Sequence, residues 1–180
     1  MTARGELARG PRAHLRLISL LDREEFIGRV RRSRRLHRPW SYPPATPQEF
    51  DEYARNHRNV RHKALLVCRN EDRAIAGMFS VSQIFYGPFK SAYLGYYAFE
   101  PFAGQGYMRE GLGLVTRYAF GPLGLHRLQA SIQPGNIRSI AFVRDSGFTK
   151  EGFGRRYLKI GGRWRDHEHW VLLADDPRRA

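Results

Sequence analysis

A glycine loop that opens directly into a helix is the clearest chemical signal in this sequence. An aromatic run ends at Glu100-Pro101, and a loop carrying Gly104 and Gly106 follows before a helical pattern begins. A strand, such a loop and a helix N-terminus form a socket where main-chain N–H groups converge and the positive end of the helix favours an anion. Glycine also lets the main chain approach a ligand closely. The pattern therefore predicts a phosphate-binding loop.

Four consecutive polar residues near the C-terminus, Asp166-His167-Glu168-His169, offer a second set of ligating side chains. In a strand the two histidines share one face, a spacing that can bind a metal ion. A zinc site needs at least a third protein ligand, and none is evident in the sequence. We therefore expect a hydrogen-bonded or exposed strand pair and no metal.

The single cysteine, Cys68, excludes an intramolecular disulfide and favours a reducing, cytoplasmic compartment. It lies in the apolar run 64–68 with no histidine or aspartate close in sequence, so we expect buried packing rather than a nucleophile. The N-terminal residues lack the apolar core of a signal peptide, and no segment reaches the ~20 apolar residues of a membrane span. We expect a soluble protein.

The composition indicates one globular domain with a strong positive field. The chain has 180 residues, 42% of them hydrophobic, which suffices for a full core. Its formal charge of +14 comes from 31 Lys and Arg against 17 Asp and Glu. Such a field attracts polyanions, among them nucleic acid, ribosomal RNA and a phosphorylated cofactor. An arginine-rich proteome explains the same composition without any partner, and both explanations stand.

The N-terminal quarter predicts an arm, a strand and a helix. Residues 1–12 are expected to form a flexible basic arm, and residues 15–21 a first strand that leads into Asp22 as a helix N-cap. Glu25, three residues later, suggests a capping box, and the apolar spacing of residues 26–36 predicts one continuous helix. The arginines on this helix are expected to face solvent, with a nucleic-acid site as the alternative.

The rest of the chain alternates between helices and strands in a single domain over residues 13–175, followed by a tail at 176–180. A proline-rich loop precedes a helix from Thr46 to about His57, with Pro47 in its first turn. Asn136 caps a later short helix, and Gly161-Gly162 is the turn of a final hairpin. The predicted strands are 63–68, 75–85, 91–99, 126–132, 153–160 and 164–173. The order β-α-α-β-β-β-α-β-α-β-β predicts the α+β class with a mixed, largely antiparallel sheet covered by helices.

Three motifs resemble those of the GCN5-related N-acetyltransferases, the GNAT family, and within it the ribosomal-protein-alanine N-acetyltransferases of the RimJ and RimL type. They are FAGQGYMRE at 102–110, PGNIRSI at 134–140 and SGFTKEG at 146–152, and the ending GGRWRDH at 161–167 also resembles RimJ. The resemblance extends over His14 to Leu173. It implies a mostly antiparallel central sheet with helices on both faces and one splayed strand pair that admits the cofactor.

The resemblance implies acetyl-CoA as the acetyl donor. The amides expected to hold its pyrophosphate are those of Gly104, Gln105, Gly106, Tyr107 and Met108. Free main-chain groups near Ala98 and Phe99 are expected to pair with the pantetheine arm and to polarise the thioester carbonyl. Asn136 matches the CoA-contacting asparagine of the family. Relatives commonly open the loop with Arg or Gln, whereas Ala103 stands here, so a loop-ordering side chain is missing and weaker cofactor binding is expected.

The proton-transfer residues follow from the same resemblance. Glu151 matches the glutamate that RimL-type enzymes use as a base toward the acceptor amine, and its alternative role is an ion pair with an arginine. An α-amine has a pKa of about 8, so about a tenth of it is already neutral at pH 7, and the base has to remove only one proton from the rest. Glu100, at the mouth of the loop, is a further candidate. Many relatives carry a tyrosine where Val143 stands here, so Ser139 is expected to protonate the leaving thiolate, unless its hydroxyl bonds to its own helix.

Aromatic residues suggest where the acceptor lies. Trp40 and Tyr42 in the proline-rich loop, and Tyr86 in a later turn, are expected either to wall the acceptor groove or to anchor their loops. The expected activity is direct transfer from acetyl-CoA to the α-amine of a protein N-terminus, of the ribosomal-protein-alanine type. The alternatives are acetylation of a small amine or antibiotic, and a ribosome- or RNA-binding assembly factor with a vestigial acetyltransferase fold. The expected partners are the acceptor, the ribosome or RNA, and a second copy of the chain in a homodimer, with no membrane.

Overall fold

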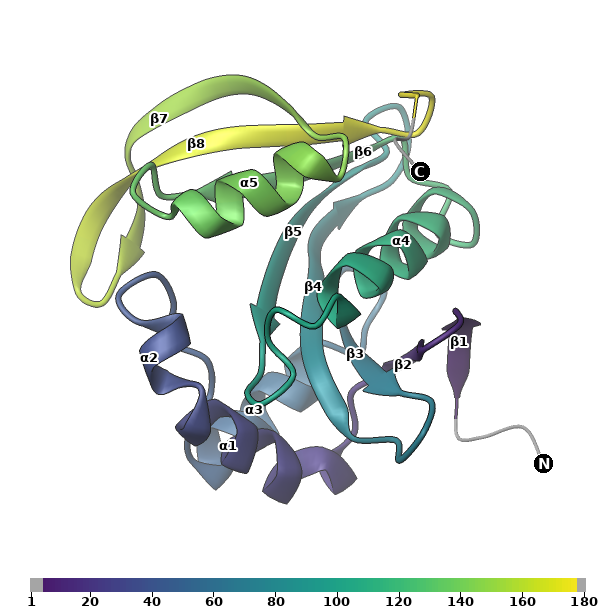
Figure 1. Cartoon of the computed structure of the whole chain (residues 1–180). Helices are drawn as coiled ribbons and strands as arrows, with labels where there is room; N and C mark the ends of the chain where they lie inside the picture. The colour runs from purple at the N-terminus through teal and green to yellow at the C-terminus, as the bar shows by residue number, and fades with distance from the viewer. Residues whose placement is uncertain (1–4, 178–180) are drawn as a thin grey trace.

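The computed structural model describes residues 5–177 and places their strands in one eight-stranded sheet (Figure 1). The strands are β1 (Glu6–Arg9), β2 (Ala13–Leu17), β3 (Lys63–Arg69), β4 (Ile75–Phe85), β5 (Ser91–Ala98), β6 (Arg127–Ile132), β7 (Thr149–Ile160) and β8 (Arg163–Leu173). Their order in the sheet is β1-β2-β3-β4-β5-β6-β8-β7. Only β5 and β6 run parallel, so the predicted mixed, largely antiparallel sheet is confirmed.

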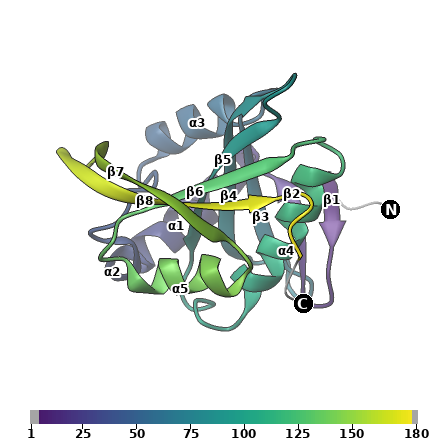
Figure 2. The same cartoon turned by 90° about the horizontal axis from the view of Figure 1, so that it is seen from above.

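Helices cover both faces of this sheet, as expected. They are a 3-10 turn (Leu20–Asp22), α1 (Arg23–Arg32), α2 (Arg34–His37), α3 (Pro47–Asn56), α4 (Tyr107–Phe120) and α5 (Ile137–Asp145). Figure 2 shows α3 on one side of the strands and α4 and α5 on the other. Because side chains alternate along a strand, β3 serves two cores. Leu65 and Val67 pack with α4, whereas Leu66 and Cys68 pack with α1 and α3.

The helix caps and the hairpin that depend on neighbouring residues form where the sequence predicts them. Thr46 Oγ1 accepts a hydrogen bond from the Glu49 amide at 3.3 Å, and the Glu49 carboxylate accepts one from the Thr46 amide at 3.1 Å. Pro47 occupies the first helical position. The β7–β8 hairpin turns at Gly161-Gly162. Burial raises the pKa of the Cys68 thiol to about 11, in agreement with a packing role. No helix within residues 5–177 is long and apolar enough to cross a membrane.

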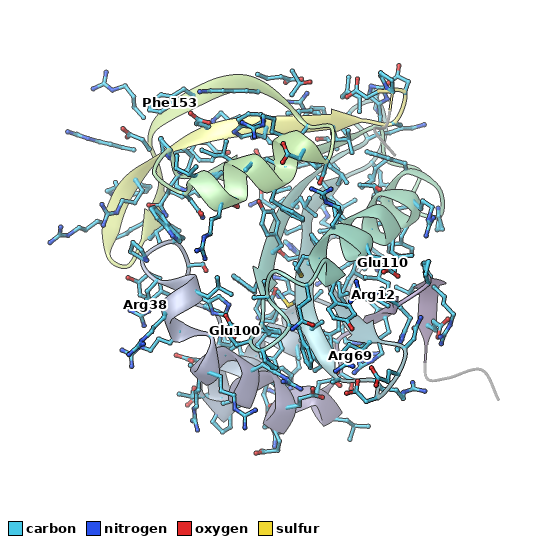
Figure 3. All side chains as sticks on the ribbon, viewed as in Figure 1. Arg12, Arg38, Arg69, Glu100, Glu110 and Phe153 are labelled. Atoms are coloured by element: carbon cyan, nitrogen blue, oxygen red, sulfur yellow. The ribbon has the colours of Figure 1, made fainter. Side chains whose placement is uncertain are left out.

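The predicted N-terminal arm is wrong for Glu6–Arg9, which form β1 against β2. A carboxylate distant in sequence holds the turn between these strands. Glu110 Oε1 on α4 accepts hydrogen bonds from the Arg12 amide at 2.8 Å and the Ala13 amide at 2.9 Å, and Figure 3 shows Arg12 and Glu110 side by side. No local pattern reveals this bond. Residues 1–4 and 178–180 lie outside the described residues, so the arm and the tail are untested there.

The predicted first strand and the caps of the first helix also need correction. The strand ends at Leu17, and the Asp22 carboxylate accepts from Arg16 at 2.7 and 2.9 Å and from the Ser19 amide at 2.7 Å, so it does not cap α1. Glu25 accepts from the Ile75 amide at 2.8 Å instead of closing a capping box. Asp22 binds the partly buried Arg16 guanidinium, and Glu25 binds a strand amide 50 residues away, and hydrogen bonds to a carboxylate are stronger than those between neutral groups.

The helix predicted over residues 26–36 is interrupted at Ser33, which separates α1 from α2. The Ser33 hydroxyl donates to the Arg29 carbonyl at 2.7 Å and accepts from the Glu100 amide at 2.8 Å. A serine hydroxyl that bonds back within a helix loosens it and can bend it. The break turns α2 toward the end of β5, next to the glycine loop.

The closest approach of α4 to the sheet supplies a stability prediction. A Cβ on Gly111 would lie 2.6 Å from Val67 Cγ2 and 3.2 Å from Phe79 Cε2, whereas a Cβ on Gly113 would meet nothing within 4 Å. We expect Gly111→Ala to lower the free energy of unfolding by about 1–3 kcal/mol through overpacking. Gly113→Ala should raise it by about 0.5–1 kcal/mol through helix propensity. Chemical denaturation measures both, and effects of the same sign would contradict this packing.

Candidate functional site

The parallel strands β5 and β6 separate partway along their length. They pair only from Ser91 with Arg127 to Tyr93 with Gln129, and β5 then continues to Ala98 paired with β4 but no longer with β6. The Phe99 amide donates to the Ala76 carbonyl at 3.0 Å. Because these bonds alternate along an antiparallel pair, the main-chain groups of Tyr96 and Ala98 point away from β4 into the space left by β6. This is the geometry expected of a splayed strand pair.

A cavity of about 900 Å³ lies at this separation. Its walls come from α2 and the loop after it (Arg35, Leu36, His37, Trp40, Ser41), the end of β5 (Tyr96, Tyr97, Ala98, Glu100), the glycine loop and first turn of α4 (Ala103, Gly104, Gly106, Met108, Arg109), and the start of α5 (Gly135, Asn136, Ile137, Arg138, Ser139, Phe142). The volume suits a small ligand or cofactor. Three arginines and one carboxylate are the charged lining residues, which favours an anion.

One end of the cavity is formed by the N-terminus of α4. Gly106 is the N-cap residue with φ of +87°, in the left-handed region, and Glu110 supplies the first amide that bonds back to it, at 3.1 Å. The amides of residues 107–109 therefore have no partner within the helix and are available to a ligand. Gly104, Gly106 and Met108 line the cavity. Gln105 and Tyr107 are not part of the lining, and the Gln105 amide donates to the Phe102 carbonyl at 3.2 Å, so in this structure it is not free for a ligand, contrary to expectation.

Arg12 supplies the loop-ordering contact that Ala103 cannot make. Its Nη1 donates to the Gln105 carbonyl at 3.0 Å, and its guanidinium lies 4.4 Å from the centre of the Tyr107 ring. The Gln105 side chain closes the other side of the loop by donating to the Pro101 carbonyl at 2.8 Å. Sequence analysis placed Arg12 in an arm and missed this role, because the two contacting segments are far apart along the chain.

Two hydroxyls meet at the opposite end of the cavity. Tyr96 Oη on β5 and Ser139 Oγ on α5 lie 2.5 Å apart. The Asn136 side chain accepts from the Ser139 amide at 3.4 Å and so caps α5, as predicted. Burial raises the pKa of Tyr96, so its hydroxyl stays protonated well above neutral pH. The Ser139 hydroxyl thus bonds to a tyrosine rather than to its own helix, and Tyr96 is a functional candidate that the sequence did not single out within an aromatic run.

Of the main-chain groups expected to be free near Ala98 and Phe99, only some have no partner in the protein. The Phe99 amide is taken by Ala76, and its side chain is fully buried, so this expectation is wrong for Phe99. The Ala98 carbonyl accepts from His37 Nε2 at 2.8 Å, which leaves the Ala98 amide directed into the cavity. His37 is 5% exposed, and burial lowers its pKa, so the ring is neutral. His37 is a second residue that the sequence did not reveal.

The aromatic residues predicted for the acceptor site fall in different places. Trp40 lines the cavity, and its carbonyl accepts from Gln133 at 3.1 Å. The Tyr42 ring lies under the Arg38 guanidinium at 3.8 Å and packs against the β7–β8 turn. Tyr86 donates to the Val60 carbonyl at 3.2 Å and is not part of the lining. In this structure Tyr42 and Tyr86 anchor loops, whereas Trp40 alone of the three walls the cavity.

The two predicted candidates for the base also differ in position. Glu100 lines the cavity beside the glycine loop (Figure 3). Glu151 on β7 lies outside the lining and accepts from Arg127 at 2.6 and 3.1 Å, the ion pair named as its alternative role. Within residues 5–177 no group of three or more His, Cys, Asp or Glu side chains gathers as a metal site.

Comparison with known sequences identifies the family. Residues 12–149 match the acetyltransferase (GNAT) domain family. The chain is 30% identical over 179 residues to the probable N-acetyltransferase YjcK of Bacillus subtilis strain 168, covering 94% of this chain and 98% of that protein. It is 36% identical over 106 residues to the ribosomal protein uS5-alanine N-acetyltransferase of Escherichia coli K12, covering 59% of this chain and 55% of that enzyme.

Solved structures have the same fold. The ribosomal-protein-S5-alanine acetyltransferase of Vibrio fischeri superposes with a TM-score of 0.81 at 27% identity, over 94% of this chain and 97% of that one. RimJ of Mycobacterium smegmatis in complex with CoA-disulfide has a TM-score of 0.82 at 23% identity, over 91% of this chain and 82% of that one. The glycine loop, the splayed strands and these matches agree. The chain belongs to the GNAT family of acetyltransferases and is an N-acetyltransferase.

Proposed function

We propose that this enzyme transfers an acetyl group from acetyl-CoA to the α-amine of a protein N-terminus, of the ribosomal-protein-alanine type. The observation that carries the proposal is one cavity with the free amides of a helix N-terminus at one end and a hydroxyl pair at the other. A thioester that runs between them along β5 has its diphosphate on the α4 amides and its sulfur near Tyr96 and Ser139. The E. coli relative, whose acceptor is an alanine of uS5, supports the acceptor class.

The residues of the cavity fit the donor. The loop offers unpaired amides, and the β5 main chain beyond Tyr93 offers hydrogen-bonding groups to an amide-containing arm. Bound acetyl-CoA supplies an activated acetyl thioester. The protein then contributes positioning, exclusion of water and a proton donor for the leaving sulfur, for which the Tyr96–Ser139 pair is the candidate.

The charge of the cavity supports a peptide acceptor over a polycationic small amine. Arg35, Arg109 and Arg138 line it against Glu100 alone, so a polyamine would meet like charges. A peptide N-terminus brings one positive charge and can bring acidic residues behind it. The net charge of +14 also favours encounter with a ribosome, where such an acceptor would be found.

Two measurements test the proposal. Isothermal titration should show acetyl-CoA binding to the purified enzyme. Mass spectrometry should then show one acetyl group added to a peptide with an N-terminal alanine, and none added to the same peptide with a blocked N-terminus. Absence of acetyl-CoA binding would favour an assembly factor instead. Acetylation of small amines in preference to the peptide would assign the acceptor to that class.

A further inference from the structure

Large apolar side chains lie exposed at the end of the molecule where the β4–β5 hairpin turns. They have exposed fractions between 42% and 69% and are Val60, Phe85, Tyr86 and Phe89. Figure 2 shows the hairpin extending away from the sheet on the side where α3 lies. The turn adjoins the Ser91 end of β5, whereas the cavity lies at the Ala98 end, about 23 Å further along the strand. This exposed surface is therefore separate from the cavity.

A second segment, distant in the sequence, completes the surface. Tyr86 Oη donates to the Val60 carbonyl at 3.2 Å, and the Ile84 amide donates to the Arg61 carbonyl at 3.0 Å. These bonds hold the loop before β3 against the hairpin. Because its hydroxyl already has a partner, the Tyr86 ring can stay half exposed without leaving a polar group unsatisfied.

The remaining rings are held by the hairpin itself. The ring centres of Phe85 and Phe89 lie 5.7 Å apart, and both rings keep a large part of their surface open to solvent. The base of the turn is fixed to β6, since the Lys90 carbonyl accepts from the His126 amide at 2.7 Å and from the Arg127 amide at 3.1 Å. An exposed apolar patch that the backbone holds in place is typical of an interaction site.

Positive charge dominates this end of the molecule. Asp and Glu are absent from the stretches that form it, residues 53–70, 73–99 and 111–144. The side chains of Arg61 and Lys90 have no hydrogen-bond or ion-pair partner among residues 5–177. Two aspartates follow β8, which adjoins this end, and one of them, Asp176, accepts from the Leu173 amide at 2.9 Å. The surface therefore favours an anionic partner.

Unpaired RNA matches this combination of rings and cations. Bases stack on exposed aromatic rings while the phosphates between them bind basic side chains. Three of the four exposed apolar side chains are aromatic, whereas a lipid surface or an acidic polypeptide has no flat base to stack on them. A two-fold dimer through this surface would bring the same unpartnered cations of both copies together. RNA is thus favoured over a second copy of the chain.

We propose that this hairpin surface binds single-stranded RNA, with bases stacked on its rings and phosphates on its two cations. Its members are Val60, Arg61, Phe85, Tyr86, Phe89 and Lys90. Such binding is independent of acetyl transfer, because none of these residues lines the cavity. An enzyme held to RNA through its hairpin would leave the cavity at the other end of β5 open to an acceptor.

The role of the rings is tested with a fluorescent oligoadenylate of about 12 nucleotides, whose binding is followed by anisotropy. Phe89→Leu keeps the apolar bulk but removes the flat ring, and we expect it to raise the Kd about 10-fold. Phe89→Trp should bind at least as tightly as the wild type. Phe153→Leu changes an equally exposed phenylalanine on β7 and should leave the Kd unchanged.

The role of the cations is tested by the salt dependence of the same binding. The double variant Arg61→Gln with Lys90→Gln should lower the slope of log Kd against log salt concentration by about 1.4, since each contact with a single-stranded phosphate contributes about 0.7. The matched control is Arg32→Gln with Arg34→Gln, at exposed arginines of α1 and α2. It should keep the wild-type slope. All these variants should acetylate a peptide at the wild-type rate when RNA is absent.

Several outcomes would overturn the inference. A wild type that binds no oligoadenylate would do so, and so would equal Kd values for the wild type and Phe89→Leu. Loss of binding in the Arg32 and Arg34 variant alone would place RNA on the first helices. Binding to phosphatidylserine vesicles, or dimerisation, that depends on Phe89 while oligoadenylate does not bind would assign the surface to a membrane or to a second copy. An enzyme that acetylates its peptide but binds no RNA overturns this inference and leaves the proposed function standing.

Discussion

Loss of both cavity hydroxyls, in the double variant Tyr96→Phe with Ser139→Ala, is expected to lower kcat about 100-fold. The two hydroxyls lie only 2.5 Å apart, so either can donate a proton to the departing sulfur. Without both of them the sulfur would leave as a thiolate. Burial raises the pKa of Tyr96, so its hydroxyl remains protonated as pH rises past neutrality and the wild-type rate should show no loss from its ionisation there. Steady-state kinetics with saturating acetyl-CoA measure the effect.

The two single variants separate a shared role from two independent ones. Because each hydroxyl can substitute for the other, each single variant should lower kcat by less than about 10-fold, which is the square root of the loss expected in the double variant. Tyr118→Phe on α4 is the control for removal of a phenolic hydroxyl outside the cavity. Unchanged kcat in the double variant, with normal thermal unfolding, would remove these hydroxyls from the mechanism.

Replacement of Gly106 is expected to have a large effect on acetyl-CoA affinity and so tests the role of the glycine loop. Gly106→Val should weaken acetyl-CoA binding at least about 30-fold, because a β-branched residue strains at φ of +87° by about 2 kcal/mol or more and the loop must move its amides. Gly106→Asn should bind within a few-fold of wild type, since asparagine tolerates the left-handed region. Titration calorimetry with acetyl-CoA compares the two.

The pair of variants isolates backbone conformation from steric block. Both add a side chain toward the same space, where a Cβ on Gly106 meets only Arg12 Nη1 at 3.6 Å. Equal loss of affinity in the two variants would mean that bulk at this position matters, and not the positive φ. Retained affinity in Gly106→Val would contradict the placement of the diphosphate at this loop.

Local signals predicted much of the fold because their partners are close in sequence. The Thr46–Glu49 box, the Asn136 cap and the Gly161-Gly162 turn each depend on residues within three positions, and each forms as predicted. The same local reasoning failed at Asp22 and Glu25. Asp22 binds the Ser19 amide and the Arg16 guanidinium rather than an amide of α1, and Glu25 binds the Ile75 amide of β4 rather than closing a capping box.

The catalytic candidates show the limit of sequence reasoning most clearly. Ser139 was identified through its motif, but its partner Tyr96 lies 43 residues away, and His37 meets Ala98 across 61 residues. Glu151 matched the motif of a base, yet the register of β6, β7 and β8 pairs it with Arg127. A motif specifies a residue type and not the side chains that surround it.

Three motifs of the amino-acid sequence indicated the GNAT family through their resemblance to it. Local patterns located the glycine loop at Gly106 and most of the strands and helices, because these depend on hydrophobic periodicity, on residues that allow unusual backbone angles and on short-range caps. Only the tertiary structure decided which side chains share the cavity and which are held in ion pairs. The reason is that strand register and the splay of β5 from β6 bring together residues that no local rule connects.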